Sequence, residues 1–374
     1  MTTLVITSIP SPYQVELFDA LAADDSGFRA VYVSRRDRSR SWTDPPLRHR
    51  AMFLDQVGTA NGALGRWVDE ACLVVFSDYS SRIVRDAMRR REASGKPWCF
   101  WGERPGYHGL GRLGQTWRRL GLAPLHSNRH VPIWGIGQWA VEEYRKEFGD
   151  DRLYYDVPYF SDLDRFRTAA ATRSSIPGTV RFLYSGALTK RKGVDLLADA
   201  FRRLGLTHEH VTLSVLGAGP LRSRMERSLG AVMSRVRFHG FVHWRNLPAI
   251  YAQADVLCAP SRYDGWGLIV PEGMAAGMPV IATDQMGSAL ELIDREDNGW
   301  LIRANDENDL YQALREAAEI TPNRLMDMAR AAQSRSSQQG VAEGVRRFRA
   351  ALEDTRGAWR QRASWGSLSA ILPA

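Results

Sequence analysis

The chain has 374 residues, of which 44% are hydrophobic and 25% charged, and its formal net charge is +8. This length predicts two domains rather than a single core, and the composition excludes a disordered, collagen-like or low-complexity protein. No run of 18 or more apolar residues is present, so we expect no transmembrane helix. The positive charge favours an anionic partner, which is a nucleotide, a phospholipid surface or a nucleic acid.

The start of the chain and its cysteines indicate a compartment. Residues 1–14 lack a basic lead and a long apolar core, so we expect no signal peptide. The three cysteines, Cys72, Cys99 and Cys258, lie in apolar runs without metal-ligand spacing. We expect them to be buried thiols of a reducing compartment, which predicts a cytoplasmic protein.

Strand-like and helix-like segments alternate along the first half of the chain, which predicts a parallel sheet covered by helices. The apolar residues of the segment 13–23 recur at helical spacing, for example. The expected strands are 3–8, 28–34, 71–77 and 96–103, and the expected helices are 13–23 and 80–94.

The alternation stops at residues 154–178 and then resumes. The expected strands of the second half are 180–186, 211–219, 236–242 and 255–261, with helices at 193–204, 220–230 and 246–254. We therefore predict an α/β protein with two doubly wound, Rossmann-like domains facing a central cleft. The expected bounds are 1–165 and 166–352, with a terminal helix at 353–374 that returns to the first domain.

The stretch "SRYDGWGLIVPEGMAAGMPVIATD" (261–284) carries the clearest chemical signal. We expect Pro271 to begin a helix, so that Glu272 lies in its first turn near free N–H groups that attract anions. Glu272 is then suited to bind a ribose diol and Asp264 to bind a second sugar. The structural alternative is that Glu272 only complements the helix dipole and Asp264 caps a turn.

This stretch resembles the signature of family 4 glycosyltransferases, which are retaining enzymes with the GT-B fold. The matching residues are the acid Asp264, then Gly265, Trp266 and Gly267, then Glu272 eight positions after the acid, then "GMPVIAT" (277–283). Order and spacing agree with the family over roughly 170 residues of the second half, which is more specific than any lone glycine motif.

The resemblance implies that the second domain, 166–352, binds a nucleotide-sugar and that the first domain, 1–165, binds the acceptor. Its expected donor-binding residues come from the loops that follow several strands: Gly186, Arg191, Lys192, Gly217, Gly219, Phe241, Gly265, Trp266, Gly267, Leu268 and Glu272. Lys192 and the N–H groups of Gly267 and Leu268 are suited to meet the charge that grows on a departing nucleoside diphosphate. The alternative for Lys192 is a solvated basic turn.

The chain departs from the family pattern at three positions. Asp264 stands where the family usually has Glu, so its carboxylate reaches one methylene less far. Ala187 stands where the phosphate loop often has Arg, and Lys190 or Arg191 would have to supply the missing charge. Gly273 replaces a common Ala at a cost of about 0.5–1 kcal/mol in a helix.

The first domain resembles the family more loosely. Residues 9–13 should border the cleft, and Glu103 and His108 follow an expected strand. In many members a histidine near this strand end contacts the transferred sugar. Glu103 is our first candidate for that catalytic position and His108 the second, beside Asp264 and Lys192. The alternative for Glu103 is a structural salt bridge.

Residues 104–140 contain five arginines and no Asp or Glu. Leu110, Leu113, Trp117 and Leu120 recur at helical spacing while Arg112, Arg118 and Arg119 lie off that stripe. This pattern is typical of a basic helix on an anionic membrane surface, but also of an ordinary surface helix. Asp162 and Asp164 fall where the resemblance places a structural turn, and the pair His126/His130 has no evident third ligand, so we expect no metal and no other cofactor.

The resulting prediction is sugar transfer, with retention, from a UDP- or GDP-sugar to a hydroxyl of a small-molecule, glycan or lipid-linked acceptor. This activity fits a cytoplasmic protein. Peripheral attachment to the inner face of the membrane stays open as an alternative. The alternatives are a sugar-nucleotide epimerase or phosphorylase of the same fold, an inactive family member, and a basic nucleic-acid-binding protein. The last alternative is disfavoured because no aromatic residues interleave a basic patch.

Overall fold

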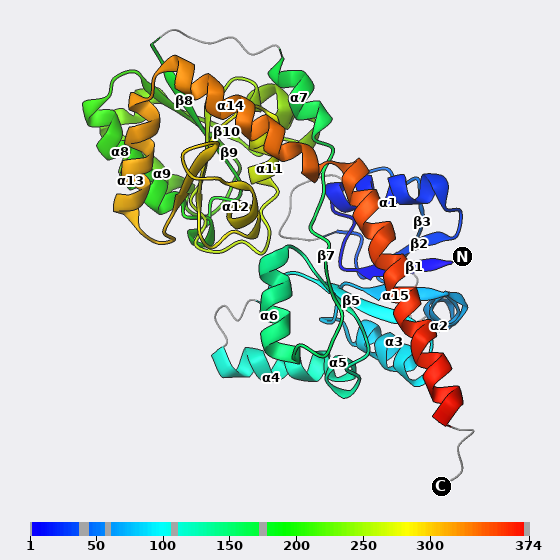
Figure 1. The fold of residues 1–374 in the computed structure, drawn as a ribbon. Coiled ribbons are helices and arrows are strands. Elements are labelled where there is room, and N and C mark those ends of the chain that lie inside the picture. Colours follow the sequence, from blue (N-terminus) through cyan, green and yellow to red (C-terminus); the bar gives the residue numbers. More distant parts are fainter. Residues whose placement is uncertain (1, 37–44, 57–60, 106–110, 172–177, 370–374) are drawn as a thin grey trace. The chain divides into compact units, whose positions relative to one another are not determined.

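The computed structural model describes residues 2–36, 45–56, 61–105, 111–171 and 178–369. The chain folds into two compact units (Figure 1). The first unit comprises residues 1–160 and 341–374, and the second comprises residues 161–340. The expectation of two doubly wound units is confirmed.

A seven-stranded parallel sheet forms the first unit, in the order β3-β2-β1-β4-β5-β6-β7. Its strands are β1 (Thr3–Thr7), β2 (Phe28–Tyr32), β3 (Arg50–Phe53), β4 (Leu73–Phe76), β5 (Trp98–Gly102), β6 (Ile133–Gly135) and β7 (Tyr154–Asp156). The central strands β1, β4 and β5 are buried along their whole length. Their continuous apolar runs are what a sheet covered on both faces requires.

A six-stranded parallel sheet forms the second unit, in the order β10-β9-β8-β11-β12-β13. Its strands are β8 (Val180–Ser185), β9 (Val211–Leu216), β10 (Val236–Gly240), β11 (Val256–Ala259), β12 (Val280–Thr283) and β13 (Gly299–Ile302). In both sheets the chain moves outward from the first strand to the third and then returns to the other side of the first.

Helices cover both sheets (Figure 1). Those of the first unit are α1 (Pro12–Asp24), α2 (Asn61–Glu70), α3 (Arg82–Ala93), α4 (Gly111–Gly121), α5 (Ala123–Ser127), α6 (Gln138–Phe148) and α15 (Val341–Ser369). Those of the second unit are α7 (Asp164–Ala170), α8 (Val194–Thr207), α9 (Arg222–Leu229), α10 (Leu247–Tyr251), α11 (Ile269–Ala275), α12 (Gly287–Leu292), α13 (Glu307–Glu319) and α14 (Pro322–Ser336). Short 3-10 turns are η1 (Lys190–Lys192), η2 (Gly230–Arg235), η3 (Trp244–Asn246) and η4 (Ser337–Gln339).

The last helix, α15, is an integral part of the first unit and runs along α1 (Figure 1). Phe348 is fully buried and packs edge-on against Trp101 and Trp134, with ring centroids 5.5 and 5.1 Å apart. The Trp134 indole N–H donates to the Thr355 hydroxyl over 3.1 Å, and the Trp359 indole N–H donates to the carbonyl of Trp98 over 3.0 Å.

The unit boundaries differ from the expected 165/166 and 352/353. The second unit starts at Ser161 and ends at Gly340, two residues joined by an isolated bridge. The return to the first unit falls at Val341 because α15 is one continuous helix that packs on that unit from its first turn onward. A side chain on Gly344 would already lie 2.6 Å from the ring of Phe160.

One expectation about the cysteines is wrong. Cys99 and Cys258 are buried, but Cys72 is exposed. Cys72 lies between α2 and β4, one residue before the strand begins, so the apolar run that follows it does not cover its side chain.

Candidate functional site

The loops that follow β8 and β11 lie at the point where the strand order of the second unit reverses. β8 and β11 are neighbours in the sheet, although β9 and β10 separate them along the chain. In doubly wound sheets, ligands bind at the carboxyl ends of the strands at such a switch point. The two loops, 186–193 and 260–268, contain most of the residues that the sequence motif singled out.

An ion pair joins these two loops. Lys192, in η1, contacts the carboxylate of Asp264 through its ammonium group. The two side chains are 17% and 16% exposed, so both border solvent although most of each is covered. The fold therefore holds a cation and a carboxylate side by side at the switch point.

Two arginines tie the same loops together. The Arg262 guanidinium donates to the carboxylate of Asp195 over 2.6 and 3.0 Å and to the carbonyl of Lys190 over 2.5 Å. Burial alone would raise the pKa of Asp195, but the hydrogen bonds and charge of Arg262 outweigh it and lower that pKa. Arg191 donates to the carbonyl of Tyr263 over 3.0 Å. In this structure Arg191, which we expected to bind the donor, braces the loop that carries Asp264.

The glycines expected to bind the donor allow two loops to lie in direct contact. Gly217 has φ +123°, and a Cβ there would lie 1.9 Å from the carbonyl oxygen of Gly186. A Cβ on Gly219 would lie 2.5 Å from the carbonyl oxygen of Leu188. The Gly186 N–H donates to the carbonyl of Leu216 over 3.0 Å. Gly186 therefore lets its loop lie directly against the loop of Gly217, but its own N–H is already bonded to Leu216.

Trp266, which we expected to bind the donor, has its side chain in the core. It is only 1% exposed. The Ser288 hydroxyl lies 2.8 Å from the carbonyl oxygens of both Trp266 and Gly267 and holds this loop to α12. Gly265 and Gly267 are buried with Trp266, whereas Asp264 and Leu268 on either side of them are half-buried and border solvent.

Glu272 lies in the first turn of α11, as expected, and is half-buried. The helix nevertheless begins at Ile269, two residues before Pro271. Proline is tolerated there because the N–H groups of a first helical turn have no acceptor within the helix. Leu268 directly precedes the helix, and its carbonyl accepts the Glu272 N–H over 3.1 Å.

Phe241 follows β10 at the same edge of the sheet and is 45% exposed. A large apolar side chain at this position contributes little to the core. An exposed aromatic ring at the end of a strand is suited to stack on a nucleobase.

In the first unit, Glu103 follows β5 at the carboxyl edge of the sheet and is exposed. Its backbone carbonyl accepts a hydrogen bond from the hydroxyl of Tyr144 over 2.8 Å. The second candidate of this unit, His108, lies outside the described residues.

Sequence reasoning missed a buried carboxylate at the switch point of the first sheet, where β1 and β4 are neighbours. Asp78 is 6% exposed and accepts hydrogen bonds from the Ser8 hydroxyl over 2.7 Å and from the Ser80 N–H over 2.6 Å. The signal was an acid two residues after a fully apolar strand, which resembles an ordinary turn residue.

The arginine-rich helix α4 is only partly a surface feature. Arg118, which we expected to lie off the apolar stripe of a surface helix, is 6% exposed and pairs with Glu147 over 3.0 Å. Leu120, expected on the apolar stripe, is 64% exposed. The Leu110 position and the side chains of Arg112, Leu113 and Trp117 lie outside what the structure describes.

Within the residues that the structure describes, no helix combines the length and hydropathy that crossing a membrane requires. Within the same ranges, no three His, Cys, Asp or Glu side chains gather in a way that could hold a metal ion.

The two doubly wound units define the GT-B fold of glycosyltransferases. HepE of Anabaena, solved in complex with UDP, superposes with a TM-score of 0.75 over 95% of this chain and 100% of that one, at 16% sequence identity. The same protein in complex with UDP-glucose gives a TM-score of 0.70 over 95% of this chain and 100% of that one.

Sequence comparisons concern the second unit. Residues 179–319 match the family model described as glycosyl transferases group 1. An uncharacterized glycosyltransferase of Methanocaldococcus jannaschii is 35% identical over 130 residues, which are 34% of this chain and 33% of that protein. D-inositol 3-phosphate glycosyltransferase of Xylanimonas cellulosilytica is 34% identical over 173 residues, 42% of this chain and 40% of that protein. The chain thus matches less than half the length of these curated relatives, and the likeness to solved structures supports the GT-B fold.

Proposed function

We propose that the protein transfers a sugar from a nucleotide-sugar to an acceptor hydroxyl. The observation that carries this proposal is the Lys192–Asp264 pair at the switch point of the second sheet. It lies within the region that is similar to glycosyltransferases. A basic turn or an acidic cap alone would not require the two loops to be fastened together by Arg262 as well.

The donor is a UDP- or GDP-sugar, with each of its parts assigned to a loop. Phe241 stacks on the base, and Glu272 accepts hydrogen bonds from the ribose diol. Lys192 and the backbone around Gly267 meet the diphosphate. Asp264 accepts hydrogen bonds from the transferred sugar.

The chemistry follows from these charges. Breaking the bond between sugar and diphosphate leaves negative charge on the phosphate, and a cation fixed beforehand stabilises that charge in the transition state. We assign this role to Lys192 and to backbone N–H groups rather than to a metal ion. The acceptor hydroxyl attacks from the face that the diphosphate leaves, with the leaving phosphate as base, so that the configuration is retained.

The ion pair also accounts for the departure at Asp264. Without ligand, the carboxylate neutralises Lys192, so neither charge is left uncompensated at a partly covered site. A nucleotide-sugar replaces each half of the pair: its phosphate contacts Lys192 and its sugar hydroxyls contact Asp264. The shorter side chain of Asp, compared with Glu, suits a carboxylate that must lie directly against this lysine.

A thermal-shift panel of nucleotides and nucleotide-sugars tests the proposal. We expect one nucleotide class to raise the unfolding temperature of the wild type, since a ligand at 100 times its Kd stabilises by about 2.7 kcal/mol. Glu272→Gln and Lys192→Ala should lose most of that shift. The matched controls Glu319→Gln and Lys146→Ala alter exposed side chains elsewhere and should keep it. Equal shifts in all five proteins would remove this site from donor binding.

Product analysis separates the rivals. Release of nucleoside diphosphate that depends on an acceptor alcohol indicates transfer, while an isomerised nucleotide-sugar or a phosphate-dependent reaction indicates the epimerase or phosphorylase.

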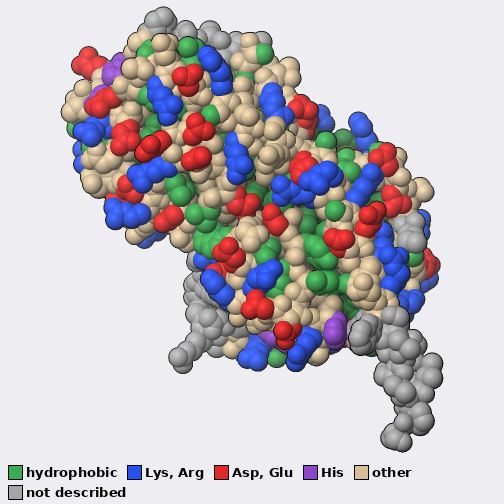
Figure 2. Space-filling model, in the orientation of Figure 1, with side chains coloured by type: hydrophobic (Ala, Val, Ile, Leu, Met, Phe, Trp, Pro, Cys, Tyr) green, Lys and Arg blue, Asp and Glu red, His purple; other side chains and the backbone are tan. Residues whose placement is uncertain are grey.

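Lys and Arg side chains are interspersed with Asp and Glu on the face shown in Figure 2. That pattern gives no single basic patch for nucleic acid on this face, and salt-sensitive DNA binding without nucleotide-sugar binding would contradict the proposal.

A further inference from the structure

A buried histidine joins the edge strand of the first sheet to its neighbours. His49 directly precedes β3, the end strand of that sheet, which pairs with β2 (Figure 1). The His49 side chain is fully buried and lies edge-on to the rings of Phe18 and Phe28, with centroids 5.8 and 6.3 Å apart. Because histidine titrates near neutral pH, this packing makes the attachment of β3 sensitive to protons.

Both ring nitrogens of His49 have partners. Nδ1 lies 2.6 Å from the carboxylate of Asp19 in α1, and Nε2 lies 2.9 Å from the hydroxyl of Tyr32 at the end of β2. An ionised carboxylate only accepts, so Nδ1 carries the proton of the neutral ring, and the Tyr32 hydroxyl donates to Nε2. Burial, followed by the charge of Asp19, raises the pKa of Tyr32 well above its usual range, so Tyr32 keeps its proton. The three side chains thus form a chain of hydrogen bonds with one arrangement of protons.

Asp19 also holds the backbone that leads into β3. The same carboxylate oxygen accepts the N–H groups of Arg48 and His49 over 2.8 and 2.9 Å. Three hydrogen bonds therefore fasten the start of β3 to α1, and one of them comes from a titratable ring. Beyond the other end of β3, the Asp55 carboxylate accepts from the Ser34 hydroxyl over 2.8 Å, so that end is held by a carboxylate and a hydroxyl.

Asp19 is the charged side chain in contact with the ring of His49. Burial lowers the pKa of His49, and the hydrogen bond and charge of Asp19 offset this effect only in part. The other charged residues of α1, β2 and β3 and beside His49 are Glu16, Asp24, Arg29, Arg48 and Arg50. Arg29 and Arg50 lie against the ring of Trp67 in α2 instead. The folded first unit therefore favours the neutral form of His49.

We propose that Asp19, His49 and Tyr32 form a pH-sensitive switch, in which a second proton on the His49 ring, at Nε2, releases the start of β3 from α1 and β2. That proton points at the Tyr32 oxygen, so the hydroxyl must turn and its own hydrogen loses its acceptor inside the core. The ring then also carries a charge among the apolar rings of Phe18 and Phe28. The switch concerns the first unit and does not depend on the proposed sugar transfer.

Release of β3 changes a cavity of the first unit. The cavity has a volume of about 390 Å³, and its lining residues are Pro10, Arg35, Pro45, Pro46, Leu47 and Phe53. Residues 45–47 lie just before His49, and the ring of Phe53 stacks on that of Tyr32 with centroids 5.4 Å apart. Two sides of the cavity therefore depend on the switch, which couples the shape of the cavity to pH.

Hydrogen exchange of the full chain, measured by mass spectrometry and corrected for the intrinsic rate at each pH, tests the switch. Protection of residues 49–53 should be full above the released-state pKa of about 6.5 and should fall by up to about tenfold per pH unit below it. His49→Asn keeps a donor toward Asp19 but does not titrate, so its protection should not change between pH 7.5 and pH 5.5. The control His239→Asn removes a histidine of the second unit whose pKa burial also lowers, and it should keep the wild-type response.

NMR of ring-labelled histidine gives a second measurement, made on the wild type itself. The signal of His49, assigned by its absence in His49→Asn, should titrate below pH 6.5. In Tyr32→Phe the pKa of His49 should rise, because the neutral ring loses the hydrogen bond that favours it. A His49 pKa at or above about 6.5 in the wild type, or one that Tyr32→Phe leaves unchanged, would overturn the proposal. Protection of β3 that falls equally in the wild type and in His49→Asn would do the same.

Discussion

The two units share the same strand order over their first six strands, yet they differ in how the chain completes them. The second unit is one continuous segment, residues 161–340. The first unit needs α15 from the far end of the chain, and the most buried aromatic residue of that helix, Phe348, lies among three aromatic side chains of the sheet and α1. The same architecture is therefore specified locally in one half and by distant sequence in the other.

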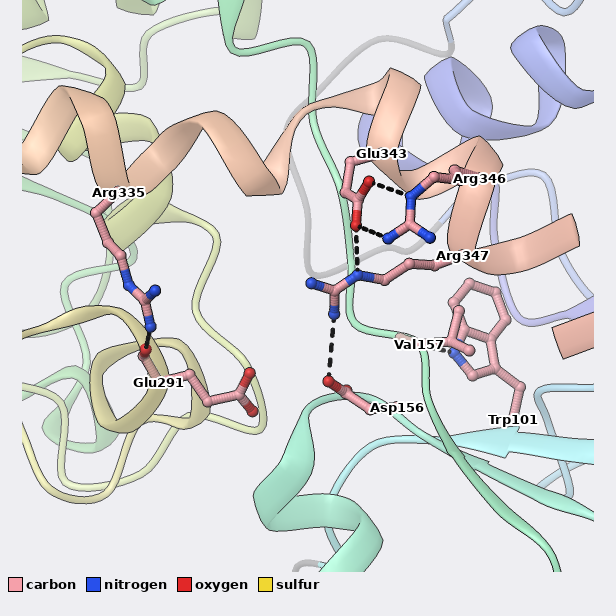
Figure 3. Close-up of polar contacts among 8 residues, drawn as sticks. All are labelled: Trp101, Asp156, Val157, Glu291, Arg335, Glu343, Arg346 and Arg347. Carbon is pink, nitrogen blue, oxygen red and sulfur yellow. Dashed lines mark hydrogen bonds and ion pairs between the residues drawn. The ribbon is translucent and has the colours of Figure 1, made fainter. Parts of the chain in front are cut away.

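The polar contacts in Figure 3 follow this difference. In the second unit, Arg335 of α14 donates to the carbonyl of Glu291 over 2.6 Å and links two helices of one continuous segment. In the first unit, Arg347 of α15 pairs with Asp156 at the end of β7 over 3.3 Å, so a side-chain contact bridges residues far apart in the sequence. Burial raises the pKa of Asp156, and Arg347 opposes that rise.

The largest effect should come from removing the anchor of α15. Phe348→Ala leaves a cavity between Trp101 and Trp134, and such a change costs about 3–5 kcal/mol. Hydrogen exchange measured by mass spectrometry should show faster exchange in residues 2–156 and in α15, with the second unit unchanged. Leu206→Ala removes a leucine that is 58% exposed and serves as the control. Loss of protection in both units together would show that they do not fold independently.

A second prediction concerns the glycine loops of the second unit. Gly217→Ala places a Cβ against the carbonyl of Gly186 in addition to straining a positive φ, and overpacking alone costs about 1–3 kcal/mol. The control Gly240→Ala has φ +70° but no atom within 4 Å of the new Cβ, so it carries only the backbone strain. Urea unfolding curves should rank Gly217→Ala as clearly less stable. Equal urea midpoints for Gly217→Ala and Gly240→Ala would mean that the loops of Gly186 and Gly217 can move apart without loss of stability.

The second unit was the more predictable one from sequence, for a physical reason. Residues such as Gly217 and Asp264 are constrained by contacts with nearby loops of the same continuous unit, so their spacing is visible as a motif. The burial of Trp266 was not visible, because a motif records which residues recur and not which way a ring turns. The contact of Lys192 with Asp264 was equally hidden, since the two residues were assigned to different parts of the ligand.

The first unit was predictable in its long apolar strands, but not in the short strands β3, β6 and β7 or in its side-chain groups. Apolar runs identified β1, β4 and β5, because a buried parallel strand is apolar throughout. The contact of Ser8 with Asp78 has no sequence signature, since each residue follows a different strand and only the sheet order brings them together. The same holds for the inward turn of Arg118, which depends on Glu147 of the neighbouring helix.

A third, smaller effect should come from Arg262 of the second unit. Arg262→Gln removes the charged partner of Asp195, and losing a hydrogen bond to a charged, partly buried group costs about 1–3 kcal/mol. Arg262 also lowers the pKa of Asp195 in the folded state. That contribution is present above the unfolded pKa of about 3.9 and is lost as the pH falls through the folded value.

The measurement is the free energy of unfolding from pH 7 to pH 3 for the wild type and Arg262→Gln. The two curves should converge at the acid end, where Asp195 is protonated in both proteins. Asp195→Asn should show a similarly flattened acid limb. A difference that stays constant with pH would assign the cost to the hydrogen bonds of Arg262 with backbone carbonyls instead.

The smallest effect concerns Glu343 at the start of α15, where the chain re-enters the first unit. Hydrogen bonds from Arg346, then from Arg347, lower the pKa of Glu343 to about 2 (Figure 3). Because Glu343 and its arginine partners border solvent, Glu343→Gln should lower the free energy of unfolding by less than about 1 kcal/mol at pH 7. The contribution is full above the unfolded pKa of about 4.3 and fades as the pH falls toward 2.

The control for this prediction is Glu353→Gln, an exposed glutamate on the same helix. Unfolding of the first unit, followed by hydrogen exchange in α15, should respond to Glu343→Gln at pH 7 and not at the acid end, while the control responds at neither. If both variants behave alike, the arginine cluster does not stabilise the start of α15. The docking of that helix would then rest on Phe348 and the buried tryptophans alone, which sharpens the contrast with the continuous second unit.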